Sequence, residues 1–175
     1  MMPWTLSNRA DPIARDIADR HYNRQKPGTP QFVPPGRCLV LRCPGAFWVT
    51  SWPFAEFVQH AWGGPGSCSA FRRESGPLAS LLVERALAAT SWRWTAPDIA
   101  CAACARHGRV SRIAMVTFID EDKVKRKRDP GRCFRRAGFV ECEERTAGGL
   151  VVLHIDRGAL PAAEAPIGAQ MEMGT

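Results

Sequence analysis

Three side chains of this sequence have the chemistry to move protons to and from a substrate. His21 and Tyr22 are neighbours in a His-Tyr-Asn-Arg cluster, and Tyr22 is the single tyrosine of the chain. Asp120 directly follows an apolar run. Near neutral pH a histidine can act as a base or bind a metal, and a tyrosine hydroxyl can act as an acid. The structural alternatives are a solvated His21, a packed Tyr22 and an Asp120 that caps a strand.

A second group of residues has the spacing of a phosphate-binding turn. Arg73 begins the sequence Arg-Glu-Ser-Gly-Pro-Leu, which ends at Leu78 and leads into a predicted helix. Gly76 would let the backbone approach a phosphate, and the first N–H groups of a helix attract anions. Pro77 removes one possible donor but is well tolerated in a first turn. A plain helix start needs the same residue types, so both interpretations stay open.

A basic run follows the apolar segment that ends at Ile119, and the whole chain has a net charge of +7. Such an excess favours anionic partners, including nucleotides, nucleic acid and acidic membrane surfaces. Part of the run has the character of a surface that follows a phosphate backbone. A solvated basic surface is the alternative. The candidate nucleic-acid contacts are Lys123, Lys125, Arg126, Lys127 and Arg128.

Cys101, Cys104 and His107 have the spacing of metal ligands. A structural zinc site needs four ligands, and His60 and Cys68 are only distant candidates for the others. The alanines around the two cysteines favour a small-residue helix packed on a neighbour. The seven cysteines are an odd number, and the N-terminal residues lack the apolar core of a signal peptide. We therefore expect reduced thiols, a cytoplasmic protein and no bound metal.

Two helices, six strands and one short helix are predicted to position these residues. The first helix has Asp11 as its N-cap and Pro12 as its first residue. The second carries Leu81, Leu82 and Ala86 on one face, together with Leu78. In chain order we predict a helix over 11–20, a hairpin over 37–51, a strand over 67–72, a helix over 78–90, a strand over 113–119, a short basic helix ending at Gly138, and a hairpin over 139–155.

The length of 175 residues and the apolar content of 45% are sufficient for one domain with a real core, predicted over residues 1–156. Residues 157–175 are rich in Ala, Pro and Gly and are predicted to form a disordered tail. No apolar run approaches the roughly 18 residues that cross a bilayer, so no membrane partner is expected.

This order of elements resembles the GNAT superfamily of N-acetyltransferases, and two motifs carry the resemblance. The segment from Arg73 to Leu78 stands where those enzymes have an Arg/Gln-x-x-Gly-x-Gly/Ala loop that holds the coenzyme A pyrophosphate. Leu78 departs from that pattern, in which a small residue is usual. The sequence Cys133-Phe134-Arg-Arg-Ala-Gly-Phe139 is similar to their Phe-Tyr-x-x-x-Gly-Phe motif. The resemblance covers about residues 11–156.

The resemblance implies an α/β fold of the α+β kind. Its central sheet would be mixed, mostly antiparallel and flanked by helices, with a V-shaped cleft for acyl-CoA. It also implies an acyl-CoA-dependent N-acyltransferase with acetyl-CoA as cofactor. The residues that it implies for coenzyme binding are Arg72, Arg73, Ser75, Gly76, Leu78, Arg132, Cys133 and Phe134.

Phe134 departs from the family pattern at a position of chemical importance. The tyrosine that the family often has there acts as general acid for the departing thiolate, and phenylalanine has no proton to give. Two explanations stay open. Either Cys133, Tyr22 or a water molecule protonates the sulfur, or the protein no longer performs ordinary acetyl transfer.

Within the superfamily, the order of the His-Tyr pair, the loop from Arg73 and Asp120 is similar to that in phage Mom-type DNA-modification proteins, which modify adenine N6. The similarity implies that His21, Tyr22 and Asp120 border the acceptor. The basic run would then hold DNA, and the target base would leave the stack. Three alternatives stay open: an inactive protein of this fold that only binds nucleic acid, an acetyltransferase for a small-molecule or protein amine, and a zinc-bearing structural protein.

Overall fold

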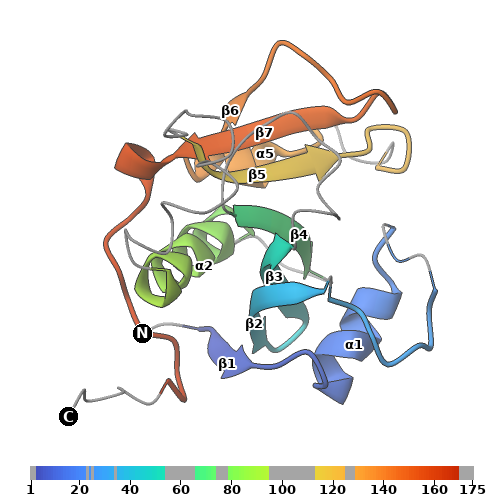
Figure 1. The fold of residues 1–175 in the computed structure, drawn as a ribbon, viewed down its shortest axis with the longest axis vertical. Helices are drawn as coiled ribbons and strands as arrows, with labels where there is room; N and C mark the ends of the chain where they lie inside the picture. The colour runs from blue at the N-terminus through green and yellow to red at the C-terminus, as the bar shows by residue number, and fades with distance from the viewer. Residues whose placement is uncertain are drawn as a thin grey trace.

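The computed structural model of the chain describes residues 3–22, 24, 26–33, 35–53, 66–73, 79–94, 113–124 and 129–169, with the backbone alone at 52–53 and 66–73. The strands of this part form a single sheet, and the helices pack against it (Figure 1). The helices are α1 (Pro12–Asp19), α2 (Ala79–Arg93) and α5 (Arg132–Arg136), with a 3-10 turn η2 (Arg157–Ala159).

The sheet has seven strands in the order β1-β2-β3-β4-β5-β7-β6. Every neighbouring pair is antiparallel except β4 and β5, which run parallel. Two antiparallel parts are therefore joined by one parallel step, and the prediction of a mixed α+β fold is confirmed. The strands are β1 (Thr5–Ser7), β2 (Gly36–Cys43), β3 (Ala46–Pro53), β4 (Gly66–Arg73), β5 (Ile113–Ile119), β6 (Val140–Glu141) and β7 (Val151–Asp156).

Different helices cover the two faces of the sheet. Successive residues of a strand point to opposite faces, and in β3 Trp48 belongs to the core shared with α2 and α5. Its neighbours Phe47 and Val49 instead pack with Ala14 and Ile17 of α1. Because β3 is buried on both faces, its first half, Ala46–Val49, is a continuous apolar run without polar alternation, and the polar Thr50 and Ser51 that follow are buried as well.

Helix α1 begins where the sequence predicted, at an aspartate N-cap. Asp11 accepts hydrogen bonds from the N–H groups of Ile13 at 2.8 Å and Ala14 at 3.2 Å. The same carboxylate accepts a bond from the Ser7 hydroxyl and lies 2.8 Å from Arg42 Nε. Burial raises the pKa of Asp11, but these hydrogen bonds and the Arg42 charge outweigh burial and hold the pKa below its ordinary value.

Helix α2 is buried on more sides than the sequence predicted. Leu81, which we expected on the core face, is 38% exposed, whereas Val83 and Leu87 are fully buried. The reason lies in the C-terminal segment, which passes along a second side of the helix and donates a hydrogen bond from Glu164 N–H to Ala88 O at 3.1 Å.

Residues 157–169, for which composition predicted a disordered tail, are folded onto the sheet. Figure 1 shows this segment running from β7 past α2 to β1. The Ile167 N–H donates to Trp4 O at 2.9 Å, and Ile167 O accepts from Leu6 N–H at 2.8 Å. The edge strand β1 presents backbone groups that need a partner. Pro and Gly disfavour an α-helix in this segment, but they do not prevent such pairing. In the described part of the chain, no helix is long and apolar enough to cross a membrane.

Candidate functional site

The pairing inside the sheet is short at the parallel step between β4 and β5. Among the described residues, the ladder of this step consists of two pairs, Gly66 with Met115 and Ser67 with Val116. The antiparallel ladders on either side are longer, with six pairs between β3 and β4 and six between β5 and β7. The two halves of the sheet are thus held together at the N-terminal end of β4.

A β-bulge lies directly after this short ladder. Thr50 of β3 pairs with Cys68, but its neighbour Val49 pairs with Ala70, so Ser69 is an extra residue in β4. A bulge bends its strand and strengthens the local twist, and bulges are frequent beside active sites. The bulge therefore gives a physical reason for the end of the pairing between β4 and β5.

The C-terminal ends of β4 and β5 lie at the same edge of the sheet, because the two strands are parallel. Arg72 and Arg73 end β4, and Asp120 directly follows β5. Strand β3 starts at this edge, with Phe47 paired to Arg72. The fold thereby brings three of the predicted site residues to one edge.

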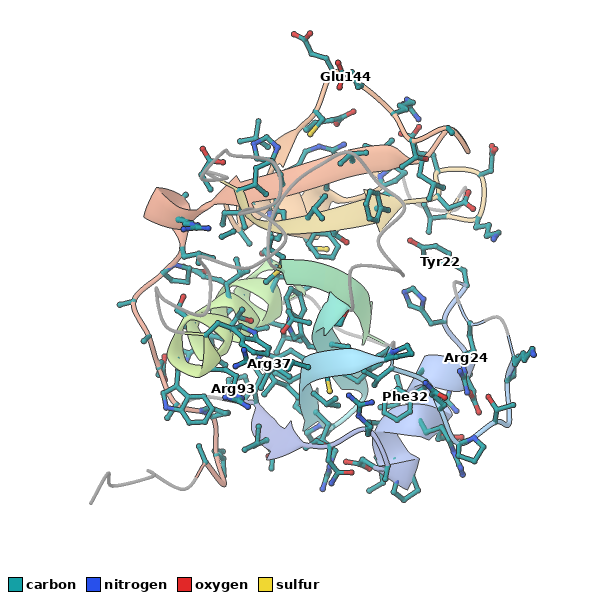
Figure 2. All side chains as sticks on the ribbon, viewed as in Figure 1. Tyr22, Arg24, Phe32, Arg37, Arg93 and Glu144 are labelled. Atoms are coloured by element: carbon teal, nitrogen blue, oxygen red, sulfur yellow. The ribbon has the colours of Figure 1, made fainter. Side chains whose placement is uncertain are left out.

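His21 and Tyr22 follow α1 and are connected to this edge through Phe47. The two rings stack with centroids 4.5 Å apart and an interplanar angle of 25°. The His21 ring also meets the Phe47 ring edge-on, at 6.3 Å between centroids. Since Phe47 pairs with Arg72, the stacked rings lie toward the end of β4. Figure 2 shows the Tyr22 side chain directed toward the middle of the molecule.

Arg24 fixes the loop that follows the stacked pair. Its guanidinium donates to Asp19 Oδ1 at 2.6 Å, to Gln31 O at 2.6 Å and to Thr29 O at 2.7 Å. The side chain is 10% exposed. The Arg24 N–H also donates to His21 O at 2.9 Å, so the same residue fixes both ends of the loop. This role of Arg24 was not predicted from the sequence, although Arg24 belongs to the same His-Tyr-Asn-Arg cluster as the stacked pair.

The Arg24 contact changes the protonation of Asp19. A hydrogen bond from Arg24 lowers the pKa of the Asp19 carboxyl, and the Gly28 N–H, at 2.9 Å, lowers it further. Burial acts in the opposite direction but is outweighed. The carboxylate is therefore stabilised in its charged form in the folded state.

Acid is expected to remove the stabilising effect of Asp19. Because its pKa is lower in the folded than in the unfolded chain, the contribution is complete above the unfolded value of about 4 and is lost as pH falls through the lowered folded value. The difference in unfolding free energy between wild type and Asp19→Asn, measured by urea denaturation, should be largest near neutral pH and should shrink steadily in acid. A difference that stays constant from neutral pH into strong acid would contradict this assignment.

Asp120 forms a turn at the end of β5. Its Oδ1 accepts a hydrogen bond from the Lys123 N–H at 3.2 Å, and its Oδ2 lies 3.4 Å from Lys123 Nζ. The structural alternative for Asp120, a cap after the strand, is therefore present. The Lys123 side chain is 57% exposed, so its charge faces solvent near this edge.

Helix α5 packs closely against the end of β5. A Cβ at Gly131, which precedes the helix and has a φ of +82°, would lie 3.1 Å from Leu153 Cδ1 and 3.5 Å from Ile119 Cγ1. Arg132, the first residue of the helix, is exposed. This tight approach places Arg132 close to the edge that carries Asp120.

Phe134 is part of the hydrophobic core. Its ring is 6% exposed and lies 6.2 Å from the Trp48 ring and 5.3 Å from the Phe139 ring, centroid to centroid. Cys133 is partly buried against the same core. In this position the Phe134 ring contributes to the packing of the hydrophobic core.

Several predicted site residues lie outside the described part of the chain. They are Ser75, Gly76 and Leu78 of the phosphate turn, Lys125, Arg126, Lys127 and Arg128 of the basic run, and Cys101, Cys104 and His107. Within the described ranges, no three His, Cys, Asp or Glu side chains are arranged to hold a metal ion.

A further polar cluster, Cys142 with His154 and Asp156, was not predicted. The predicted hairpin over 139–155 contains both Cys142 and His154, and its register, in which the Cys142 N–H donates to Val152 O at 2.9 Å, brings them together. The cysteine and the histidine are in contact, with Cys142 Sγ 3.3 Å from His154 Nδ1.

Comparisons of this chain with protein-family models, with characterised proteins and with solved structures find no match. Its function must therefore be inferred from its own residues and their geometry.

Proposed function

We propose that this chain is an acyl-CoA-dependent N-acyltransferase that binds its coenzyme at the junction of β4 and β5. The observation that carries the proposal is the parallel ladder of two residue pairs, which ends where β4 bulges. An extended ligand with amide groups can pair with the backbone of a strand. The arm of coenzyme A is such a ligand, and a bulged strand that turns from its neighbour offers a place for it.

The connection from β4 to α2 supports binding of the coenzyme phosphates at the same junction. Strand β4 ends at Arg73 and α2 begins at Ala79, so a strand, a short connection and a helix N-terminus follow one another. Such an arrangement can bind an anion, because the first N–H groups of the helix would point toward the bound anion. Arg72 and Arg73 add cationic side chains of the kind that bind phosphates.

The order of elements also supports a fold of the GNAT kind. After β1, a helix, a hairpin, a strand, a long helix, a strand, a short helix and a strand pair follow one another, as the resemblance implies. Helices flank a sheet that is antiparallel apart from one step. We propose that the V-shaped acyl-CoA cleft implied by the resemblance opens at this parallel step.

For the chemical step we assign the proton donor to Tyr22. The acceptor amine attacks the thioester carbonyl, a C–N bond forms, the C–S bond breaks, and the departing sulfur needs a proton. Phe134 cannot supply it, and its ring lies in the core. Tyr22 has the required hydroxyl and stacks on His21, which would take the proton from the amine. Asp120 would border the acceptor from the end of β5.

For the acceptor we propose an amine on nucleic acid, with adenine N6 as the leading candidate. The net charge of +7 and the exposed cations Lys123, Arg132 and Arg136 support an anionic acceptor. Adenine N6 is stacked in duplex DNA, so the base would have to be unpaired or flipped out.

The experiment incubates the purified protein with acetyl-CoA and single-stranded or duplex DNA, and with a panel of small amines and peptides. Mass spectrometry follows the acetylated product and the coenzyme A released. We expect one coenzyme A for each acetylated amine, with the rate at limiting acetyl-CoA about tenfold lower in Arg73→Ala and unchanged in Arg93→Ala. Salt-dependent DNA binding without any mass change would instead identify an inactive nucleic-acid-binding protein.

A further inference from the structure

A thiol, an imidazole and a carboxylate form a line on the hairpin of β6 and β7. Cys142 Sγ lies 3.3 Å from Nδ1 of His154, and Nε2 of the same ring lies 3.6 Å from Asp156 Oδ1. The two ring nitrogens thus face two different partners. An imidazole placed in this way can take a proton from the thiol while the carboxylate stabilises the imidazolium.

The backbone of the hairpin fixes this line. His154 and Asp156 are two residues apart on β7, so their side chains share one face. His154 pairs with Val140 of β6, and the Cys142 N–H donates to Val152 O at 2.9 Å. Cys142 therefore lies diagonally opposite His154. Because β7 is bound by β5 on its other side, the imidazole is held by an interior strand.

The line is accessible to small molecules. The Cys142 residue is half-buried, and the side chains of His154 and Asp156 are 22% and 36% exposed. A buried structural cysteine is inert because reagents cannot reach it. Cys142 is accessible and also has a base in contact with its sulfur.

Acidic residues surround this thiol. Glu141, Glu143 and Glu144 flank Cys142 in the sequence, and all three are exposed. Glu141 is paired with Arg135 at 2.5 Å, whereas Figure 2 shows Glu144 at the outer end of the loop. Glu143, Glu144 and Asp156 would repel anionic reagents and attract cationic ones.

Cys38 provides a matched comparison within the same chain. It is also half-buried, but its sulfur lies 3.3 Å from Nη2 of the Arg9 guanidinium. A positive charge beside a thiol attracts anionic reagents but cannot accept the thiol proton. The two cysteines should therefore differ both in rate and in charge preference.

We propose that Cys142 is a nucleophilic thiol that exchanges with neutral or cationic low-molecular-weight disulfides, with His154 as its base and Asp156 as a positioning residue. His154 takes the thiol proton, and the Cys142 sulfur attacks one sulfur of the disulfide. The disulfide S–S bond breaks as a new one forms to Cys142, and the departing thiolate takes the proton back from His154. Cys142 is oxidised, and the departing sulfur is reduced.

The test treats the full-length protein with cystamine, a cationic disulfide, or with oxidised glutathione, an anionic one. After acid quenching, peptide mass spectrometry follows each cysteine separately. We expect Cys142 to react with cystamine about tenfold faster than Cys38, and Cys38 to prefer oxidised glutathione. His154→Gln should lower the rate at which Cys142 reacts with cystamine about tenfold and leave the rate at Cys38 unchanged.

Equal rates at Cys142 and Cys38 with cystamine would overturn the proposal, and so would an unchanged Cys142 rate in folded His154→Gln. If His154→Gln does not fold, Asp156→Asn decides instead. Asp156→Asn should lower the reaction rate of Cys142 severalfold and shift the pH profile of this rate. Loss of a purely structural residue would leave the profile unchanged. This test needs neither coenzyme A nor an acceptor amine, so its outcome is separate from that of the acyltransferase proposal.

Discussion

Replacing Phe134 by alanine is expected to lower the free energy of unfolding by about 3–4 kcal/mol, within the range for buried aromatic residues. The ring lies in the core between Trp48 and Phe139, and its removal leaves a cavity beneath α5. Urea denaturation followed by circular dichroism measures the change.

Arg136→Ala is the control for this substitution. Arg136 lies on the same helix and is exposed, so its loss should change the unfolding free energy by less than about 0.5 kcal/mol. A loss below about 1 kcal/mol for Phe134→Ala would place the ring outside the core. The same packing predicts that Phe134→Tyr does not raise the rate of acyl transfer, since the added hydroxyl would enter the core.

Replacing Tyr22 by phenylalanine is expected to lower kcat for acyl transfer about 100-fold and to leave the Kd for acetyl-CoA unchanged within about twofold. The substitution removes only the hydroxyl, and a phenylalanine ring can keep the stack on His21, whose own ring contacts Phe47. The coenzyme A released is measured under saturating acetyl-CoA and saturating acceptor.

The matched control for Tyr22→Phe is Phe32→Leu. Phe32 contacts the same Phe47 ring as His21 does, at 6.4 Å between centroids, but it has no proton to donate. It should leave kcat within about threefold of wild type. If Tyr22→Phe keeps kcat within twofold, the general acid is another group, and Cys133 or water becomes the leading candidate.

Local signals in the sequence were sufficient for most elements of the fold. The strand over 113–119 has the predicted bounds, because a uniform apolar run ends abruptly at Asp120. Helix α1 starts at a cap formed by Asp11 and Pro12, both of which are effective without any distant contact. The first hairpin turns at Gly45, whose φ of +70° favours a glycine.

Features that depend on distant pairing could not be predicted in this way. The strand β1 has three residues and is completed by Ile167, more than 150 positions away. The same segment is bonded to α2 at Ala88, on a side of the helix that the sequence did not predict to be covered, whereas Leu81, expected on the core face, is 38% exposed. Neither contact leaves a periodic signal in the sequence.

The features of the candidate site also differ in whether the sequence could predict them. The resemblance to the GNAT superfamily implied that His21, Arg73 and Asp120 belong to one site, and the parallel strands bring Arg73 and Asp120 to one edge of the sheet. The stack of His21 on Tyr22 and the core position of Phe134 required the packed structure. Cys142 and His154 required the register of the hairpin, which depends on the turn between the strands.

Titration of the purified protein with acetyl-CoA by isothermal calorimetry tests the central claim most directly. Coenzyme binding at the junction of β4 and β5 predicts one site per chain, with a Kd between roughly 1 μM and 1 mM, the range of ordinary enzyme substrates. In Arg73→Ala the Kd should rise about tenfold, while in Arg93→Ala it should stay at the wild-type value. Absence of binding to the folded wild-type protein at millimolar acetyl-CoA would contradict the account.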